Sequence, residues 1–532
     1  MAADTANRQT AAAPVVVAAG RSPIRSLAVL LLCVSSILLY ANTLKNGFVL
    51  DDPHVITKNR LVTQGMAGIP ELLHTPHLYG YTVSANDTYR PLSLILLAAE
   101  YQLWGAEPAY YHGVNILLFC CCVLLLFFVL DDLFLQKRTG MAFLAALLFA
   151  VHPIHTEVVA NVKSCDELLG FCFAFLSLRL HMRYMRAGRV VLLLSGCLCF
   201  LLSVLSKETS FTFLAVIPLV FFFYSYEHRR RAMFITAGIF ATALVFLAAR
   251  YGVLVHYHAN DPSNVDFMNM ELARPGLSLA SKLATAALVM GYYMKLVFIP
   301  WPLIWDYAYN TIPFTQFTDL RVLLTLGAYL SLAIVGVIRL RRNRKDPYAF
   351  AALFFLFTIS MFTNIPFSSG ATLAERFLFF PSVSACMVIA LLLEHWAGNE
   401  LNNIPSVIKN TRVLAVLVPL CIVGSYLTIS RNRDWTDEYT LYTADIQKAP
   451  NDARLNYYLG TELESNIAQQ EKDPAAHRQL LEQAIVYLQR AVRIYPEYGV
   501  AEWNVKDVSL DNTDNKKHRQ PDNNSTTLPA RM

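Results

Sequence analysis

The sequence predicts an all-α polytopic membrane protein that continues into a short α-solenoid segment. Of its 532 residues, 55% are hydrophobic and only 16% are charged, and the mean hydropathy is +0.39. A soluble globular protein carries about 25% charged residues. The apolar residues come in runs of about 17–20 residues separated by short charged stretches, which is the pattern of many membrane-spanning helices.

The apolar runs predict about eleven spans. The first follows Arg21 and Arg25 and is too long for the apolar core of a signal peptide, so we expect an anchor after a cytoplasmic tail of residues 1–25. The spans are expected at residues 26–44, 112–130, 139–157, 167–180, 190–206, 211–226, 232–250, 321–338, 349–366, 377–394 and 413–430. They define a membrane domain over residues 26–430, with large outer loops at about 45–111 and 251–320.

Basic residues gather in four loops between these runs. The loops hold Lys137 with Arg138 and the stretches 179–189, 227–231 and 339–345. A cytoplasmic N-terminus places all four on the cytoplasmic face, as the positive-inside rule requires. An odd number of spans then puts the C-terminus on the outer face. The net charge of +5 therefore reflects topology and does not predict a nucleic-acid partner.

The segment from Lys282 to Pro300 is also apolar enough to cross a membrane. Counting it as a span would move the basic loop at 339–345 to the outer face, against the positive-inside rule. We therefore expect a re-entrant or interfacial helix there.

Isolated polar residues of mixed type fall almost entirely on the outer face. They are Asp51, Asp52, Arg90, His152, His155, Glu157, Lys163, Asp166, Glu167, Lys207, Glu208, Asp306, Tyr307, Glu375 and Arg376. Because the basic loops alone set the topology, this sorting is independent evidence for one polar site on the outer face.

The lengths of two helical arms refine this prediction. Thirteen residues separate Arg138 from His152, and eleven separate Glu167 from Arg179. At 1.5 Å per residue these arms span about 20 and 17 Å, against a hydrocarbon core of about 30 Å. The segment from His152 to Glu167 is thus expected at membrane depth, in a polar cavity, where ionisable groups are usually functional. Local thinning of the bilayer is the alternative.

Asp51 and Asp52 have two readings that the sequence leaves open. One of them can serve as a catalytic base that takes a proton from an acceptor hydroxyl, while its neighbour holds it in place. Alternatively, Asp52 caps a helix, because Pro53 follows it and proline is favoured in the first helical turn.

The other polar residues favour a bound anion over a metal. His152, His155 and Glu157 lack the His pair at i and i+4 that zinc proteases use, so no metal site is predicted, and these side chains are expected to bond a polar ligand or to be structural. Four basic residues close to spans suit a phosphate on a lipid. They are Arg90, Lys163, Lys207 and Arg376. Local ion pairs, such as Lys207 with Glu208 and Arg376 with Glu375, are the alternative.

Several other features carry no chemistry in this reading. The ten cysteines lie mostly in apolar runs and are expected to be small core residues. No Gly-rich loop joins a strand to a helix, so a nucleotide site is not predicted. Asn86, Asn523 and Asn524 fit the N-glycosylation pattern.

The segment 431–505 matches a helical repeat. Asn456, Tyr457, Leu459 and Gly460 fit the first helix of a tetratricopeptide repeat, and Pro496 ends a second helix after an insertion. Such repeats need about three units for stability, so the pair is either docked on the membrane domain or cut short. Residues 506–532 are polar and expected to be disordered.

Eight stretches give the chain a family resemblance. They are FVLDDPHVITKN, YRPLS, YHGVNILLF, HPIHTEVVANVKSCDELLG, SKETSFTFLAV, KLVFIPWPLIWDYAYNTIP, AERFLFFPSV and DWTDEYTLYTADIQKAPNDARLNYYLG. In this order, over about residues 44–460, the chain resembles the transmembrane and tetratricopeptide-repeat-containing proteins, which include O-mannosyltransferases that act on cadherins. That family belongs to the C-type glycosyltransferases, polytopic enzymes that use a polyprenyl-phosphate sugar and carry a carboxylate in the first lumenal loop.

The resemblance implies a function. Asp51 or Asp52 would be the base of an inverting transfer from dolichyl-phosphate mannose to Ser or Thr hydroxyls of lumenal proteins, in the endoplasmic reticulum membrane or, for a bacterial chain, the plasma membrane. The polar residues of the outer face would bind donor and acceptor, the repeats would hold the polypeptide, and no cofactor would be needed. Cys165 stands where relatives often carry a basic residue, which weakens a phosphate site there.

Two other functions remain open from the sequence. A transporter also places charges at membrane depth, but usually shows two related halves, which this chain lacks. A non-catalytic scaffold that presents repeats leaves the polar cavity unexplained. Replacing both aspartates with Asn would separate these functions, because only an enzyme would lose turnover while staying folded.

Overall fold

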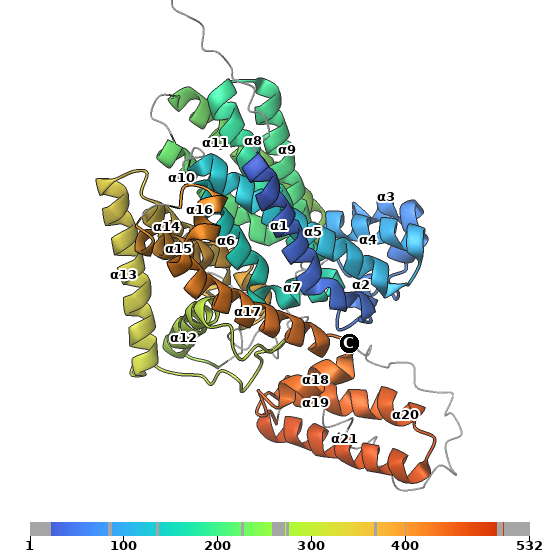
Figure 1. Ribbon diagram of the computed structural model, residues 1–532. Helices are drawn as coiled ribbons and strands as arrows, with labels where there is room; N and C mark the ends of the chain where they lie inside the picture. The colour runs from blue at the N-terminus through green and yellow to red at the C-terminus, as the bar shows by residue number, and fades with distance from the viewer. Residues whose placement is uncertain are drawn as a thin grey trace, which may run out of the picture.

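The computed structural model describes residues 23–82, 88–134, 138–224, 228–257, 272, 276–365, 370–398, 401–496 and 504. These residues form an all-α structure, without a strand in the described part, and this confirms the all-α part of the predicted class (Figure 1). Asn86, Asn523, Asn524 and the tails at 1–22 and 505–532 lie outside the described residues.

The helices of the predicted membrane domain are numbered in chain order in Figure 1. The longer ones are α1 (Pro23–Tyr40), α4 (Pro91–Trp104), α5 (Pro108–Leu133), α6 (Thr139–Val151), α8 (Cys165–Ala187), α9 (Val190–Ser206), α10 (Phe213–Tyr224), α11 (Arg229–His256), α12 (Leu279–Phe298), α13 (Leu320–Arg342), α14 (Pro347–Ile359), α15 (Ser382–Trp396) and α17 (Thr411–Asp434). Short helices connect them: α2 (Asp52–Val55), α3 (Ile69–Leu72), α7 (Thr156–Ala160) and α16 (Ile404–Lys409).

Five helices are long and apolar enough to cross a membrane. They are Arg25–Lys45, Pro108–Leu133, Arg229–His256, Leu320–Arg342 and Thr411–Asp434. A sixth span is possible if Thr139–Val151 and Pro153–Ala160, which meet at a 55° bend, act as one. Each of the eleven predicted runs overlaps a helix in the described residues, but the run 139–157 crosses the break at His152, and several of these helices are short. The count of eleven stays a prediction, because length and apolarity support five or six.

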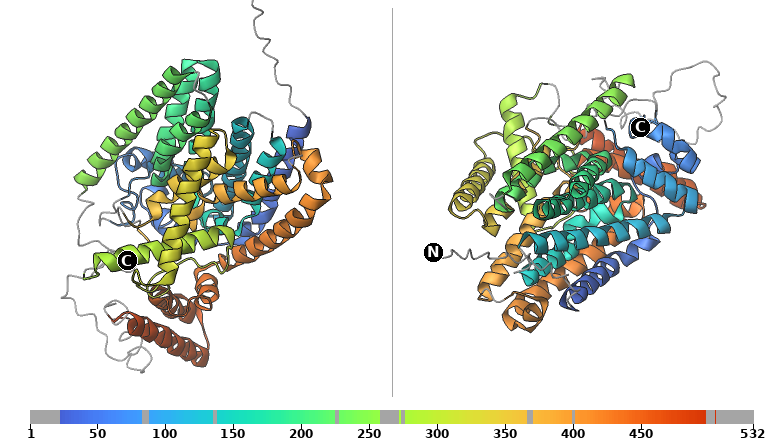
Figure 2. Two further views of the ribbon diagram at one scale, coloured as in Figure 1. Left: turned by 90° about the vertical axis from the view of Figure 1, so that its left-hand side faces the viewer. Right: turned by 90° about the horizontal axis from the view of Figure 1, so that it is seen from above.

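Helix α12, the segment expected to be interfacial or re-entrant, is a continuous helix. It lies across α13 in the turned view of Figure 2. A helix lying in a membrane plane would have this orientation relative to a span, so the interfacial reading stays open as a prediction.

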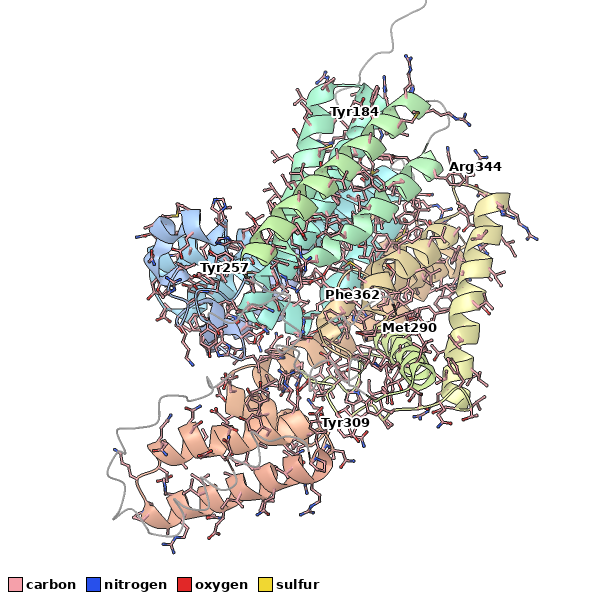
Figure 3. All side chains as sticks on the ribbon, turned by 180° about the vertical axis from the view of Figure 1, so that it is seen from behind. Tyr184, Tyr257, Met290, Tyr309, Arg344 and Phe362 are labelled. Atoms are coloured by element: carbon pink, nitrogen blue, oxygen red, sulfur yellow. The ribbon has the colours of Figure 1, made fainter. Side chains whose placement is uncertain are left out.

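Two of the four basic loops lie at the same end of the molecule. Tyr184, near the end of α8, and Arg344, after α13, both lie at the end opposite Tyr309 and the C-terminal helices (Figure 3). This arrangement agrees with the sidedness expected from the positive-inside rule.

The main apolar core lies among α1, α5, α6, α8, α14 and α15. Within this core, the rings of Phe149, Phe171 and Phe379 pack with centroids 5.1–5.5 Å apart. This aromatic cluster supports the segment between α6 and α8, which carries many of the predicted polar residues.

The C-terminal helices dock on the outer loop before α13. They are α18 (Glu438–Ile446), α19 (Ala453–Glu462), α20 (Ala468–Gln470) and α21 (Pro474–Ile494). The Trp305 backbone N–H donates to Asp445 at 2.8 Å, and Lys448 Nζ donates to the Leu303 carbonyl at 3.2 Å. These contacts join the C-terminal helices to the loop between α12 and α13.

Gly460 explains how tightly α19 and α21 pack. A Cβ at this position would lie 2.7 Å from Leu488 Cγ, so only glycine permits the observed approach. The two helices therefore pack as a pair, as the motif around Gly460 predicted. Whether they form a tetratricopeptide repeat stays a prediction.

Candidate functional site

The candidate site is built on the break between α6 and α8. His152 is extended, with φ −73° and ψ 119°, because the following Pro153 disfavours a helical conformation in the residue before it. The chain then forms only short helical turns, Pro153–His155, Thr156–Ala160 and Val162–Ser164, before α8 begins. These turns present side chains and backbone N–H groups toward the first outer loop.

Asp52 joins that loop to the break. Its carboxylate is fully buried and accepts hydrogen bonds from the backbone N–H groups of Val49 at 3.1 Å and Lys163 at 2.6 Å. Burial raises the pKa of Asp52 to about 7, although these bonds oppose the shift. The predicted capping role for Asp52 is wrong: no side-chain cap bond forms at the start of α2, and the carboxylate bonds Lys163 instead.

Asp51 has the opposite environment. Its side chain is 60% exposed, and Lys163 Nζ lies 3.5 Å from its Oδ2. Desolvation acts to raise the pKa of Asp51, but Lys163 and Arg376 outweigh it and hold that pKa below its ordinary value. Asp51 is therefore an accessible, ionised carboxylate at neutral pH, whereas Asp52 is a buried anchor.

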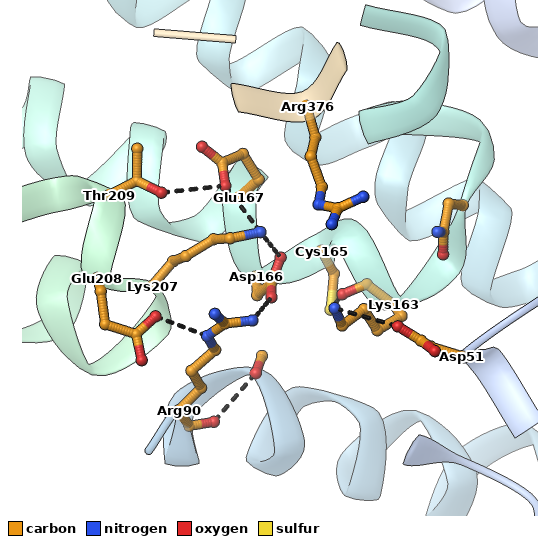
Figure 4. A network of polar contacts seen from close by, with 12 residues as sticks. Asp51, Arg90, Lys163, Cys165, Asp166, Glu167, Lys207, Glu208, Thr209 and Arg376 are labelled. Atoms are coloured by element: carbon orange, nitrogen blue, oxygen red, sulfur yellow. Dashed lines mark hydrogen bonds and ion pairs between the residues drawn. The ribbon is translucent and has the colours of Figure 1, made fainter. Parts of the chain in front are cut away.

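A network of ion pairs lies beside Asp51 (Figure 4). Arg90 bonds Glu208 at 2.7 Å and Asp166 at 3.0 Å. Lys207 bonds the other oxygen of Asp166 at 3.0 Å and Glu167 at 2.8 Å. The expected alternative pair of Lys207 with Glu208 does not form in the described residues, because Glu208 bonds Arg90.

Arg376 reaches the same region from a different part of the chain. Its guanidinium and its backbone N–H, the latter at 2.8 Å, both bond the buried Glu157, in place of the expected partner Glu375. In Figure 4 its side chain points toward the Asp166 and Lys163 side chains. Arg376 and Lys163 keep 27% and 14% of their side chains exposed, so a ligand can reach both.

The two histidines bond the protein itself, to one side of this network. His152 Nε2 lies 3.0 Å from the Val297 carbonyl, and His155 Nε2 lies 2.9 Å from Ser382 Oγ. These partners are those of structural histidines, which was one of the two readings that the sequence left open.

Three predicted residues form a second group under the C-terminal helices. Tyr307 donates to Glu375 Oε1 at 2.9 Å, and Asp306 lies 3.6 Å from Arg454. Burial raises the pKa of Glu375 to about 8. The structure thus divides the predicted polar residues into an ion-pair network near Asp51 and an interface with the C-terminal helices.

The sequence analysis missed two residues that belong near the site. Glu438 accepts a hydrogen bond from the Leu50 backbone N–H at 3.1 Å, directly before Asp51. His77 is buried beside the network. Burial lowers the pKa of His77 to about 3, and the positive charge of Arg90 is the second cause of this shift. A lone histidine gives no motif, so the sequence offered no signal for His77. Glu438 lies in the stretch DWTDEYTLY, which carries part of the family resemblance, but that resemblance assigns it no role.

Comparison with known proteins supports the resemblance. The chain is 28% identical over 466 residues to the protein O-mannosyl-transferase F38B6.6 of Caenorhabditis elegans, covering 84% of this chain and 61% of that protein. It is 25% identical to human protein O-mannosyl-transferase TMTC1, covering 91% of this chain and 57% of the relative, and 28% identical to Drosophila melanogaster Tmtc3, covering 92% and 57%.

Its curated relatives are TMTC-family protein O-mannosyl-transferases. The chain spans about three fifths of the length of these relatives. No family model matches it. The crystal structure of the apo Archaeoglobus fulgidus oligosaccharyltransferase gives a TM-score of 0.44 at 15% identity, over 82% of this chain and 60% of that one, and this likeness supports no inference.

Proposed function

We propose that this chain is a membrane-embedded glycosyltransferase that moves mannose from dolichyl-phosphate mannose to Ser or Thr hydroxyls of lumenal secretory or membrane proteins. The observation that carries the proposal is the accessible, ionised Asp51 next to a group of cations, in a chain whose relatives are named protein O-mannosyl-transferases. A hydroxyl acceptor needs a base, and a phosphate-linked donor needs positive charge.

Asp51 is the proposed base. It is the member of the pair that an acceptor hydroxyl can reach, because 60% of its side chain is exposed while Asp52 is buried. The carboxylate would take the hydroxyl proton as the oxygen attacks the anomeric carbon, and the dolichyl phosphate would leave with the bonding electrons. Asp52 holds the loop through its two backbone bonds.

Lys163 and Arg376 are the proposed partners of the donor phosphate. Arg90 and Lys207 bond their carboxylates at 2.7–3.0 Å, whereas Lys163 lies 3.5 Å from Asp51, the longest of these ion pairs. Arg376 also bonds a carboxylate, that of Glu157, but it is the most exposed of the four basic side chains, at 27%. A phosphate bound at Lys163 would compete with Asp51 for the ammonium and would leave the carboxylate free for the acceptor. Arg90 and Lys207 then serve to hold Asp166 and α8 in place.

The wider organisation is part of the proposal. We place eleven spans in the membrane domain, the basic loops in the cytoplasm, and the repeat-like segment 431–505 in the lumen of the endoplasmic reticulum, where it would hold the polypeptide acceptor. The position of two basic loops at the end opposite the C-terminal helices supports this orientation. No cofactor enters the reaction.

Transfer of labelled mannose tests the proposal. Membranes containing the chain, labelled dolichyl-phosphate mannose and a panel of secretory domains should give labelled protein. Asp51→Asn should lower the rate by about 100-fold or more, the usual contribution of a general base. Asp473→Asn is the matched control, because Asp473 is an exposed helix cap and Asn caps equally well. Equal transfer by Asp51→Asn and the control would refute the role of Asp51, whereas no transfer by the wild type to any acceptor would refute the transferase and favour a scaffold.

A further inference from the structure

The loop that carries Asp51 is held by the start of the C-terminal helical segment. Three hydrogen bonds connect them: Asn46 Nδ2 to the Asn432 carbonyl at 3.0 Å, the Gly47 N–H to the Thr436 carbonyl at 2.9 Å, and the Leu50 N–H to Glu438 Oε1 at 3.1 Å. These partners lie more than 380 positions apart in the sequence. The loop therefore takes its position from a segment that begins after the last predicted span.

The hydrogen bond from Leu50 to Glu438 involves a residue with a strained backbone conformation. Leu50 has φ +56°, in the left-handed region that a residue with a Cβ disfavours. Because Leu50 directly precedes Asp51, its backbone angles set the direction in which the Asp51 carboxylate leaves the loop. Without a partner on its N–H, Leu50 would relax to an ordinary negative φ and turn Asp51 away from Lys163.

Glu438 is the first residue of α18, so its place follows from the start of the C-terminal helices. Its side chain accepts a hydrogen bond from the Leu50 N–H, and the contact thus runs from α18 through Leu50 to Asp51. Glutamine at this position would keep that bond, because its carbonyl oxygen can accept from Leu50. Alanine would lose it.

We propose that Glu438 is a positioning residue for Asp51, which fixes Leu50 in its left-handed conformation and makes the C-terminal helical segment part of the catalytic apparatus. This inference rests on the proposed function, in which Asp51 is the base. The segment then has two tasks, since it also stands where a polypeptide acceptor would bind.

Two measurements on three variants of the full chain test the inference. Glu438→Ala should lower kcat by ten- to a hundred-fold, the range expected when a catalytic group is misplaced by about 1 Å, with the KM for labelled dolichyl-phosphate mannose unchanged. Glu438→Gln should stay within about two-fold of the wild type by the same geometric argument. Glu482→Ala, an exposed residue of α21, is the control and should change neither parameter.

Hydrogen exchange without substrate supplies the second readout. The Leu50 amide should exchange faster in Glu438→Ala alone, while the Gly47 amide, bonded to Thr436, stays protected and shows that the helical segment remains docked. Unchanged exchange at Leu50, or equal loss of kcat in the Gln and Ala variants, would overturn the inference. If the wild type transfers no mannose, the proposed function fails, while the exchange experiment still decides whether Glu438 holds Leu50.

Discussion

Replacing Asp52 with Asn should destabilise the folded protein, whereas replacing the adjacent Asp51 with Asn should not. Asp52 accepts one backbone N–H on each carboxylate oxygen, from Val49 and Lys163. In Asp52→Asn the amide nitrogen replaces one oxygen, so one buried N–H loses its acceptor and faces another donor. Leaving a buried donor unpaired costs about 1–3 kcal/mol. Asp51 is 60% exposed, and an exposed ion pair such as its pair with Lys163 contributes about 0–1 kcal/mol.

Thermal unfolding in nanodiscs measures this difference. The chain has buried free cysteines, Cys165 among them, so a thiol-reactive dye reports unfolding directly. With an unfolding entropy of about 2.1 cal/mol/K per residue, a chain of this size shifts its Tm by about 1 °C per kcal/mol. At pH 6 we therefore expect Asp52→Asn to lower Tm by about 1–3 °C and Asp51→Asn to leave it within about 1 °C.

The test also predicts the direction in which stability changes with pH. The pKa of Asp52 is about 7 in the folded protein and about 3.9 in an unfolded chain, so its stabilising contribution is present below about pH 4 and is lost as the pH rises through 7. The gap between the wild type and Asp52→Asn should narrow above pH 7. A larger loss of Tm in Asp51→Asn than in Asp52→Asn would refute the assignment of base and anchor.

Substitutions at three further positions test the packing that holds the site. Burial raises the pKa of Glu100 to about 8, so its contribution to the free energy of unfolding is full below about pH 4 and is lost as the pH rises to 8. Glu100→Gln should make the free energy of unfolding depend less on pH and raise it by about 2–4 kcal/mol at pH 8. Thermal unfolding from pH 5 to 8 measures both effects. Arg431→Met leaves the buried Asp445 without its closest cation and should lower the free energy of unfolding by about 3 kcal/mol. Arg431→Lys keeps a positive charge there and should lower it less in the same thermal assay. Gly460→Ala places a Cβ against Leu488 and should destabilise the packing of α19 on α21 by about 1–3 kcal/mol. The C-terminal helices should then be cleaved faster by a protease. An unchanged cleavage rate would show that α21 can shift to make room for the Cβ.

The amino-acid sequence by itself determined the helical class and the family resemblance. The helical class follows from a local cause, because long apolar runs leave the backbone few structures other than a helix in a membrane. The family resemblance rests on short stretches such as the one that holds Gly460. The sequence did not determine the number of spans, because hydropathy reports the composition of a run and not its length as a helix. The bend at His152 leaves two short helices where one run was expected.

Only the tertiary structure decided which aspartate is exposed and what holds it. Asp51 and Asp52 are identical in chemistry and adjacent in the chain, so nothing local separates them. They differ because Lys163, 111 positions after Asp52, brings its backbone N–H to one carboxylate and its ammonium to the other. Glu438, farther still along the chain, bonds the residue before them. Contacts between distant segments depend on how the helices pack, and that information is not present in any single stretch of sequence.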